Sequence, residues 1–136
     1  MFELFEHTAD LGLRLRAATL EELLVEAGRG LLAMLVANPE AVKPIQEKEF
    51  RLAAEAPDYL LFDWLSELLF AFECERLLLC EFDVRLTSGG LTARCRGEPM
   101  DTARHRMDHE VKAITYHGLV VRQTPGGWEG EVIVDI

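Results

Sequence analysis

The chain has 136 residues, and its 14 Lys and Arg against 24 Asp and Glu give a formal net charge of −10 at pH 7. This length suits a single domain over residues 1–136, and a content of 49% hydrophobic and 28% charged residues excludes an intrinsically disordered chain. The apolar runs are too short to cross a membrane, and the negative charge argues against direct binding of RNA, DNA or an anionic membrane.

Two strands are predicted at the N-terminus. Within residues 11–15 three leucines alternate with Gly12 and Arg14, and a period of two is typical of a strand with one face in water. Residues 2–7 are predicted to form its partner strand. The motif His-Thr-Ala-Asp, which begins at His7 and ends at Asp10, lies between the two strands.

The first helix is predicted over residues 19–36. Its apolar residues recur at spacings of three and four, and Thr19 with Glu22 three positions later forms a capping box. A loop over residues 37–46, which contains two prolines, and a weaker strand over residues 47–56 follow this helix.

The second helix is predicted over residues 57–76. Pro57 stands where the first helical turn tolerates a missing donor, and an apolar stripe of helical period follows it. Three more apolar residues, Leu60, Phe62 and Phe70, lie outside this stripe. We therefore expect the second helix to be central and buried on more than one side.

The remaining strands are predicted as two hairpins. Residues 81–87 and 91–96 flank one Gly-containing turn, and residues 118–123 and 128–136 flank another, with a loop over residues 97–110 between the hairpins. Strands in adjacent pairs favour an α+β fold with a mainly antiparallel sheet and two principal helices over a doubly wound parallel sheet.

Cysteines and the N-terminus give information on the compartment. Cys74, Cys80 and Cys95 are odd in number and contain no CxxC pair, so we interpret them as core thiols and not as a disulfide or zinc framework. Glu3 and Glu6 lie among the first residues, which is not the pattern of a signal peptide. We expect a soluble cytoplasmic protein.

Most common catalytic patterns are absent from the sequence. No G-x-S-x-G elbow, phosphate-binding loop or H-E-x-x-H motif occurs. His105, His109 and His117 either bind zinc or are solvated loop histidines. A group of four arginines either docks an anion or balances an acidic surface. These arginines are Arg94, Arg96, Arg104 and Arg106.

One cluster of oxygen donors remains. The chain closes on an apolar strand, in which Asp135 sets its side-chain carboxylate beside the α-carboxylate of Ile136. With Asp10 nearby, an oxygen-only set suits Mg²⁺, Ca²⁺ or Mn²⁺ and not zinc. Alternatively, Asp10 closes a turn by bonding its own backbone, and the C-terminus lies in water.

Four segments together resemble the archease family. They are E-H-T-A-D-L-G at residues 6–12, the helix over residues 57–70, V-K-A-I-T-Y-H-G-L at residues 111–119, and residues 132–136. The resemblance implies an α+β fold and a metal site formed by Asp10, Asp135 and the terminal carboxylate of Ile136. It also implies that the protein is an accessory protein of an RtcB-type RNA ligase. In this role the protein would promote guanylylation of the ligase with GTP and its multiple turnover in tRNA splicing and RNA repair.

The leading hypothesis is therefore a non-catalytic, metal-binding activator that meets RNA only through the ligase. His7, Lys112 and His117 are candidate contacts to a phosphate or to the partner, against the alternative of structural or solvated side chains. Two other classes of protein stay open, a metal-dependent phosphohydrolase and a chaperone-like interaction module. The sequence leaves the metal, the oligomeric state and the docking surface undetermined.

Overall fold

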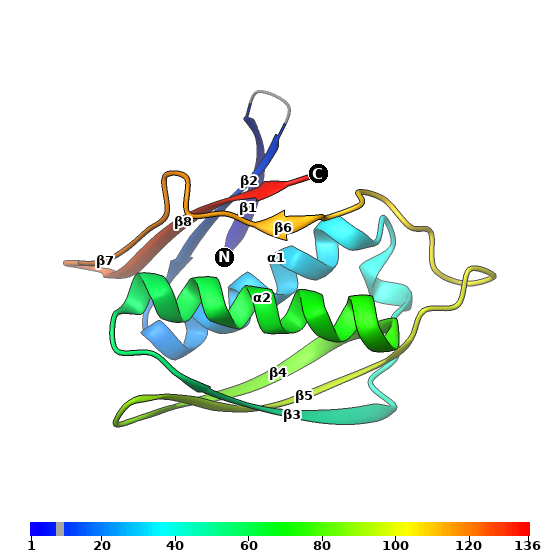
Figure 1. Ribbon diagram of the computed structural model, residues 1–136, viewed down its shortest axis with the longest axis horizontal. Coiled ribbons are helices and arrows are strands. Elements are labelled where there is room, and N and C mark those ends of the chain that lie inside the picture. The colour runs from blue at the N-terminus through cyan, green and yellow to red at the C-terminus, as the bar shows by residue number, and fades with distance from the viewer. Residues whose placement is uncertain (8–9) are drawn as a thin grey trace.

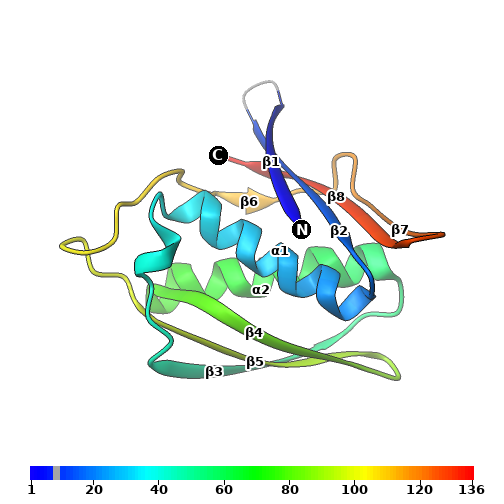
Figure 2. The same ribbon diagram turned by 180° about the vertical axis from the view of Figure 1, so that it is seen from behind.

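A computed structural model of the chain describes residues 1–7 and 10–136, and it arranges two helices between two antiparallel sheets (Figures 1 and 2). The five-stranded sheet contains β1 (Phe2–His7), β2 (Asp10–Ala17), β8 (Gly127–Asp135) and β6 (Ala113–Ile114) in this order, and β7 (Val120–Thr124) also pairs with β8. The three-stranded sheet has the order β3 (Gln46–Ala53), β5 (Gly90–Pro99), β4 (Leu77–Thr87). The helices are α1 (Leu20–Leu35) and α2 (Pro57–Glu75), and a short 3-10 turn, Pro39–Ala41, follows α1.

The predicted fold class is confirmed, because all the strand pairs are antiparallel and two long helices complete the fold. The division of the strands between two sheets was not predicted. Both helices contact strands of both sheets, so they form the middle layer of a three-layer arrangement. No helix in the described part of the chain is long and apolar enough to cross a membrane.

Both helix starts follow the predicted signals. The Thr19 hydroxyl accepts a hydrogen bond from the Glu22 N–H at 3.1 Å, which satisfies one of the unpaired donors at the start of α1. Pro57 is the first residue of α2. This helix ends where Arg76 adopts a left-handed conformation, with φ at 54°.

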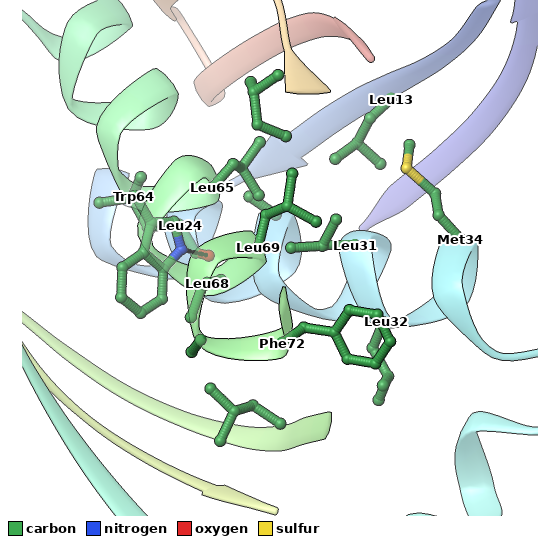
Figure 3. Packing of buried hydrophobic residues seen from close by; sticks show 14 of the residues in the cluster. Leu13, Leu24, Leu31, Leu32, Met34, Trp64, Leu65, Leu68, Leu69 and Phe72 are labelled. Carbon is green, nitrogen blue, oxygen red and sulfur yellow. Dashed lines mark hydrogen bonds between the residues drawn. The ribbon is translucent and has the colours of Figure 1, made fainter. Parts of the chain in front are cut away.

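Trp64 of α2 connects α2 to α1 and to the three-stranded sheet (Figure 3). Its indole N–H donates to the Leu24 carbonyl of α1 at 2.8 Å, which satisfies the only polar atom of a fully buried side chain. On the other side its ring makes edge contacts with Phe50 and Phe82 of the three-stranded sheet, with centroids 5.8 and 6.2 Å apart. Loss of this side chain would therefore affect the packing of α2 against α1 and against the three-stranded sheet.

The prediction that α2 is buried on more than one side is correct at Leu60 and wrong at Phe70, whose side chain is 60% exposed. Figure 1 shows the reason: α2 lies along one open side of the two-sheet arrangement, and α1 lies along the other. The core-thiol interpretation is likewise wrong for Cys74, which is exposed on α2. It is correct for Cys95, where burial raises the thiol pKa to about 12.

The strand bounds differ most in the first hairpin. β4 begins at Leu77 and not at residue 81. The prediction missed the first part of this strand because residues 77–79 are all buried and show no alternation of apolar and polar residues. A bulge follows between Leu79 and Glu81. β5 continues to Pro99, so the predicted loop over residues 97–110 begins three residues too early.

Glu98, at the end of β5, holds the segment after it through a buried polar network. Its carboxylate accepts hydrogen bonds from the Arg104 guanidinium and, at 2.6 Å, from the Lys43 N–H. His105 is also buried, so the solvated-histidine interpretation is wrong for it. Its Nδ1 accepts from the Asp101 N–H at 2.9 Å, which leaves Nε2 to donate to Glu98 at 3.1 Å.

The Arg104 guanidinium lowers the pKa of Glu98 to about 2 from its ordinary value of 4.5, against the opposing effect of burial. The stability that this charge contributes is therefore present above about pH 4.5 and is lost as the pH falls toward 2. We predict that Glu98→Gln lowers the free energy of unfolding by about 2 kcal/mol at pH 7, because a buried ionic partner is removed.

Urea unfolding between pH 7 and pH 2.5 checks this prediction. The difference between wild type and Glu98→Gln should shrink as the pH falls, and Glu40→Gln, at an exposed position, should show no such pattern. A difference that is independent of pH would contradict the proposed charge contribution.

Candidate metal centre

The register of three strands brings the predicted donors to one corner of the five-stranded sheet. His7 of β1 is the cross-strand partner of Asp10 of β2. Leu11 of β2 is the partner of Val134 of β8, and the same register continued by one residue sets Asp10 opposite Asp135. His7, Asp10 and Asp135 therefore form one row across β1, β2 and β8.

The carboxylates of this row lie on the outer face of the sheet. Leu11 and Val134 are buried, and side chains along a strand alternate between its two faces. Asp10 and Asp135 are the neighbours of these core residues, and accordingly the first is half-buried and the second is exposed. Hydrophobic burial of one face thus directs both carboxylates to the other.

The charges in the other rows of this outer face are balanced. Arg14 of β2 lies 3.1 Å from Glu3 of β1 and 3.7 Å from Glu131 of β8, measured from guanidinium nitrogen to carboxylate oxygen. Arg16 and Arg122 both approach Glu129, at 4.0 and 3.2 Å. The row at the corner has two carboxylates and no arginine or lysine. Like charges opposite each other on neighbouring strands are destabilising, so this row favours a cation.

His7 adds an unsatisfied nitrogen to the corner. Its Nδ1 lies 3.8 Å from the nearer carboxylate oxygen of Asp10, which is too far for a hydrogen bond. This nitrogen is inaccessible to solvent and lacks a hydrogen-bond partner among the described residues. The His7 ring also packs against the ring of His117, with centroids 5.4 Å apart. A buried polar atom without a partner is rare in folded proteins and is typical of functional sites.

The end of β8 is held in place by hydrogen bonds to its backbone carbonyls. The Lys112 N–H donates to the Asp135 carbonyl at 2.8 Å, and the Thr115 hydroxyl donates to the Ile133 carbonyl at 2.8 Å. The Ile136 side chain packs against the hydrophobic core. The Lys112 side chain is exposed beside this corner.

The fold thus brings all six predicted site residues, His7, Asp10, Lys112, His117, Asp135 and Ile136, to one corner. Thr8 and Ala9 of the motif lie outside the described residues. Within the described part of the chain, no group of three or more His, Cys, Asp or Glu side chains is arranged to hold a metal ion. The predicted ligand set has two such side chains and a main-chain carboxylate, and metal binding there stays a prediction.

The two alternative sites do not form. Both ring nitrogens of His105 are hydrogen-bonded in the buried Glu98 network, so this histidine is not available to a zinc ion shared with His109 and His117. The arginine group is also divided. Arg94 lies 3.3 Å from Glu49, and Arg104 is paired with Glu98, which supports charge balance over anion docking.

The sequence did not identify an aromatic stack beside the corner. The Tyr116 ring lies flat on Phe62 of α2, with centroids 3.9 Å apart and an interplanar angle of 12°. Tyr59 meets Tyr116 edge-on at 6.1 Å. The one signal of this stack in the sequence was the position of Phe62 outside the apolar stripe of α2. That position indicated a second buried side of the helix, but it did not identify Tyr116 as the residue that covers Phe62.

Comparisons with known proteins agree on one family. The model of the Archease protein family (MTH1598/TM1083) matches residues 2–136. The chain is 41% identical to Protein archease from Methanopyrus kandleri, over 99% of each protein. It is 34% identical to Protein archease from Methanosarcina mazei, over 99% of this chain and 95% of that protein.

Two solved structures have the same fold. The solution structure of Methanobacterium thermoautotrophicum protein 1598 superimposes with a TM-score of 0.86 at 32% identity, over 99% of this chain and 98% of the other. The crystal structure of an archease from Thermotoga maritima, described as a possible chaperone, superimposes with a TM-score of 0.67 at 23% identity. That match covers 100% of this chain and 98% of the other.

The unbalanced row of carboxylates leads to a prediction about stability without metal. In EDTA at pH 7, Asp135→Asn should raise the free energy of unfolding by roughly 0.2–1 kcal/mol, because it removes repulsion across two strands. Asp83→Asn is the matched control with the opposite sign, since Asp83 is the cross-strand partner of Arg94. Urea denaturation measures both, and a destabilised Asp135→Asn in EDTA would contradict this account of the row.

Proposed function

The chain belongs to the archease family, and we propose that it is a metal-binding activator of an RtcB-type RNA ligase. In this role it promotes guanylylation of the ligase by GTP and multiple turnover in tRNA splicing and RNA repair. It has no catalytic activity of its own, acts in the cytoplasm and meets RNA only through the ligase. The observation that carries the proposal is the row in which Asp10 and Asp135 share one outer face with no arginine or lysine among its described residues.

The donor set fits a divalent metal ion. Asp10, Asp135 and the α-carboxylate of Ile136 supply only oxygen, which suits the hard cations Ca²⁺, Mg²⁺ and Mn²⁺. The unsatisfied Nδ1 of His7 lies 3.8 Å from the Asp10 carboxylate, and it would orient this carboxylate if the two moved into hydrogen-bond distance. When bound, such an ion supplies positive charge that neutralises a phosphate group during transfer.

The residues of this chain position that site rather than perform the reaction. The register of β1, β2 and β8 fixes the two carboxylates, and the Lys112 N–H holds the carbonyl of Asp135. Lys112 and His117 stand beside the carboxylates, where their side chains can contact a phosphate or the ligase. A net charge of −10 favours encounter with a basic, phosphate-binding active site.

Asp10→Asn should bind a divalent ion at least about tenfold more weakly than wild type, because one anionic ligand is lost. Its stimulation of ligase guanylylation should fall to near the rate of the ligase alone, while its circular dichroism spectrum and folded state are retained. The measurements are calorimetric titration with Ca²⁺, Mg²⁺ and Mn²⁺, and transfer of labelled GMP from GTP to the ligase. Asp83→Asn on β4 is the matched control, and full stimulation by Asp10→Asn would refute the metal role.

The terminal carboxylate is tested separately. Protein released from a C-terminal thioester by ammonia ends in an amide at Ile136, whereas release by hydrolysis leaves the free carboxylate. We predict that the amide form binds the ion about tenfold more weakly, because it loses a charge without a change in size. Equal affinities of the two forms would exclude the Ile136 carboxylate as a ligand.

A second candidate function is a chaperone-like interaction module, which the exposed rings of Tyr59, Phe70 and Tyr116 favour. Metal-site variants would then keep full activity toward the ligase. A phosphohydrolase is the remaining alternative from the sequence. Turnover of nucleotides or phosphate esters by the purified protein with Mn²⁺ or Mg²⁺, in the absence of ligase, would favour it over the activator.

A further inference from the structure

The outer face of α2 carries an exposed aromatic and acidic surface. Tyr59 and Phe70 on the helix and Tyr116 stacked beside it are 56%, 60% and 60% exposed. In the described part of the chain these are the most exposed aromatic side chains, and all three lie on or against α2. Together with Phe62, Asp63 and Glu67 they define the α2 surface.

The helical period places these side chains on one face. Tyr59, Asp63, Ser66 and Phe70 follow one another at steps of four, three and four residues, so they form a single stripe about 16 Å long. This stripe lies opposite Leu61, Leu65, Leu68 and the rest of the buried face. Because α2 runs along an open side of the fold, neither sheet covers the stripe (Figures 1 and 2).

The charge of α2 is uniformly negative. Residues Pro57–Glu75 contain five carboxylates and no Lys, Arg or His. Within the described part of the chain, Glu75 is the one member of this set with an ion pair, to Lys48 at 2.6 Å. The outer sheet faces differ, since their carboxylates are matched by arginines at the positions of Arg14, Arg16 and Arg94.

From this combination we infer that the α2 surface is where the ligase docks, and that it receives an arginine-rich patch of the ligase. The inference rests on the proposed function. A guanidinium group stacks on an aromatic ring and forms paired hydrogen bonds with a carboxylate. The α2 surface offers both kinds of contact, because its aromatic rings lie beside the carboxylates of Asp63 and Glu67. Exposed aromatic side chains that become buried on binding are also typical centres of protein interfaces.

The same charges disfavour the two other occupants. A nucleic acid would bring phosphates against a face with no basic residue, where no counterion release could favour binding. A second copy related by two-fold symmetry would bring the same acidic face against itself. A basic protein surface has neither difficulty.

The α2 surface continues into the candidate metal centre. Tyr116, which stacks on α2, precedes His117 in the chain, and the His117 ring packs against His7 in the row of donors. One partner can therefore cover α2 and reach the metal corner together. Docking would then hold the carboxylates of Asp10 and Asp135 at the ligase active site.

Binding of the full chain to a purified RtcB-type ligase tests the inference, with affinity and rates measured by interferometry at low and physiological salt. Phe70→Ser and Tyr59→Ser should each lower the affinity about tenfold or more, because each removes an aromatic contact. Glu67→Lys should slow association about threefold and reduce its dependence on salt. Ile45→Ser, at an apolar side chain 73% exposed, and Glu40→Lys, in the turn after α1, are the matched controls and should bind like wild type.

The outcomes separate this inference from the proposed function. Asp10→Asn should keep the affinity for the ligase and lose stimulation. If wild type stimulates the ligase while the α2 variants bind it unchanged, the docking surface is wrong and the activator role stands. If the α2 variants instead lose self-association or binding to an RNA oligonucleotide, with ligase affinity unchanged, the surface serves one of those occupants and the inference is overturned. Absence of both binding and stimulation by wild type would overturn the inference and the proposed function together.

Discussion

The antiparallel register between β2 and β8 is the constraint on which the candidate metal centre depends. It pairs Leu11 with Val134 on the buried face, and the same alignment sets Asp10 opposite Asp135 on the outer face. A slip of one residue would send the core leucines of β2 into water and separate the two carboxylates. The free energy of burying these leucines therefore also maintains the position of the two carboxylates.

The corner differs from the rest of the outer sheet faces because its negative charges are not balanced by neighbouring arginines. Elsewhere on the outer sheet faces arginines stand between glutamates, as Arg14 stands between Glu3 and Glu131. Among the described residues the carboxylates at the corner lack such partners, and His7 Nδ1, 3.8 Å from Asp10, is unsatisfied. An arrangement that costs stability in isolation is typical of residues retained for binding. The helix α2, with five carboxylates and no Lys, Arg or His, shows the same imbalance over a larger area.

The helix α2 has two roles because it lies at an open side of the fold. Its inner face carries Trp64, which connects α1 to the three-stranded sheet through Leu24, Phe50 and Phe82. Its outer face carries the exposed rings of Tyr59 and Phe70 and a set of carboxylates. The rigid inner packing fixes the outer side chains in position, which is the property that a docking surface requires.

The sequence determined what depends on local periodicity: two amphipathic helices, their caps, antiparallel hairpins and the fold class. It also indicated Asp10 and Asp135 as candidates, since their chemistry can be read from residue type and position. Only the tertiary structure decided that the strands form two sheets, that Phe70 is exposed while His105 is buried, and that Tyr116 stacks on Phe62. The physical reason is that burial and cross-strand contacts depend on which surfaces distant segments cover, and residue spacing along one element contains no information about its neighbours in space.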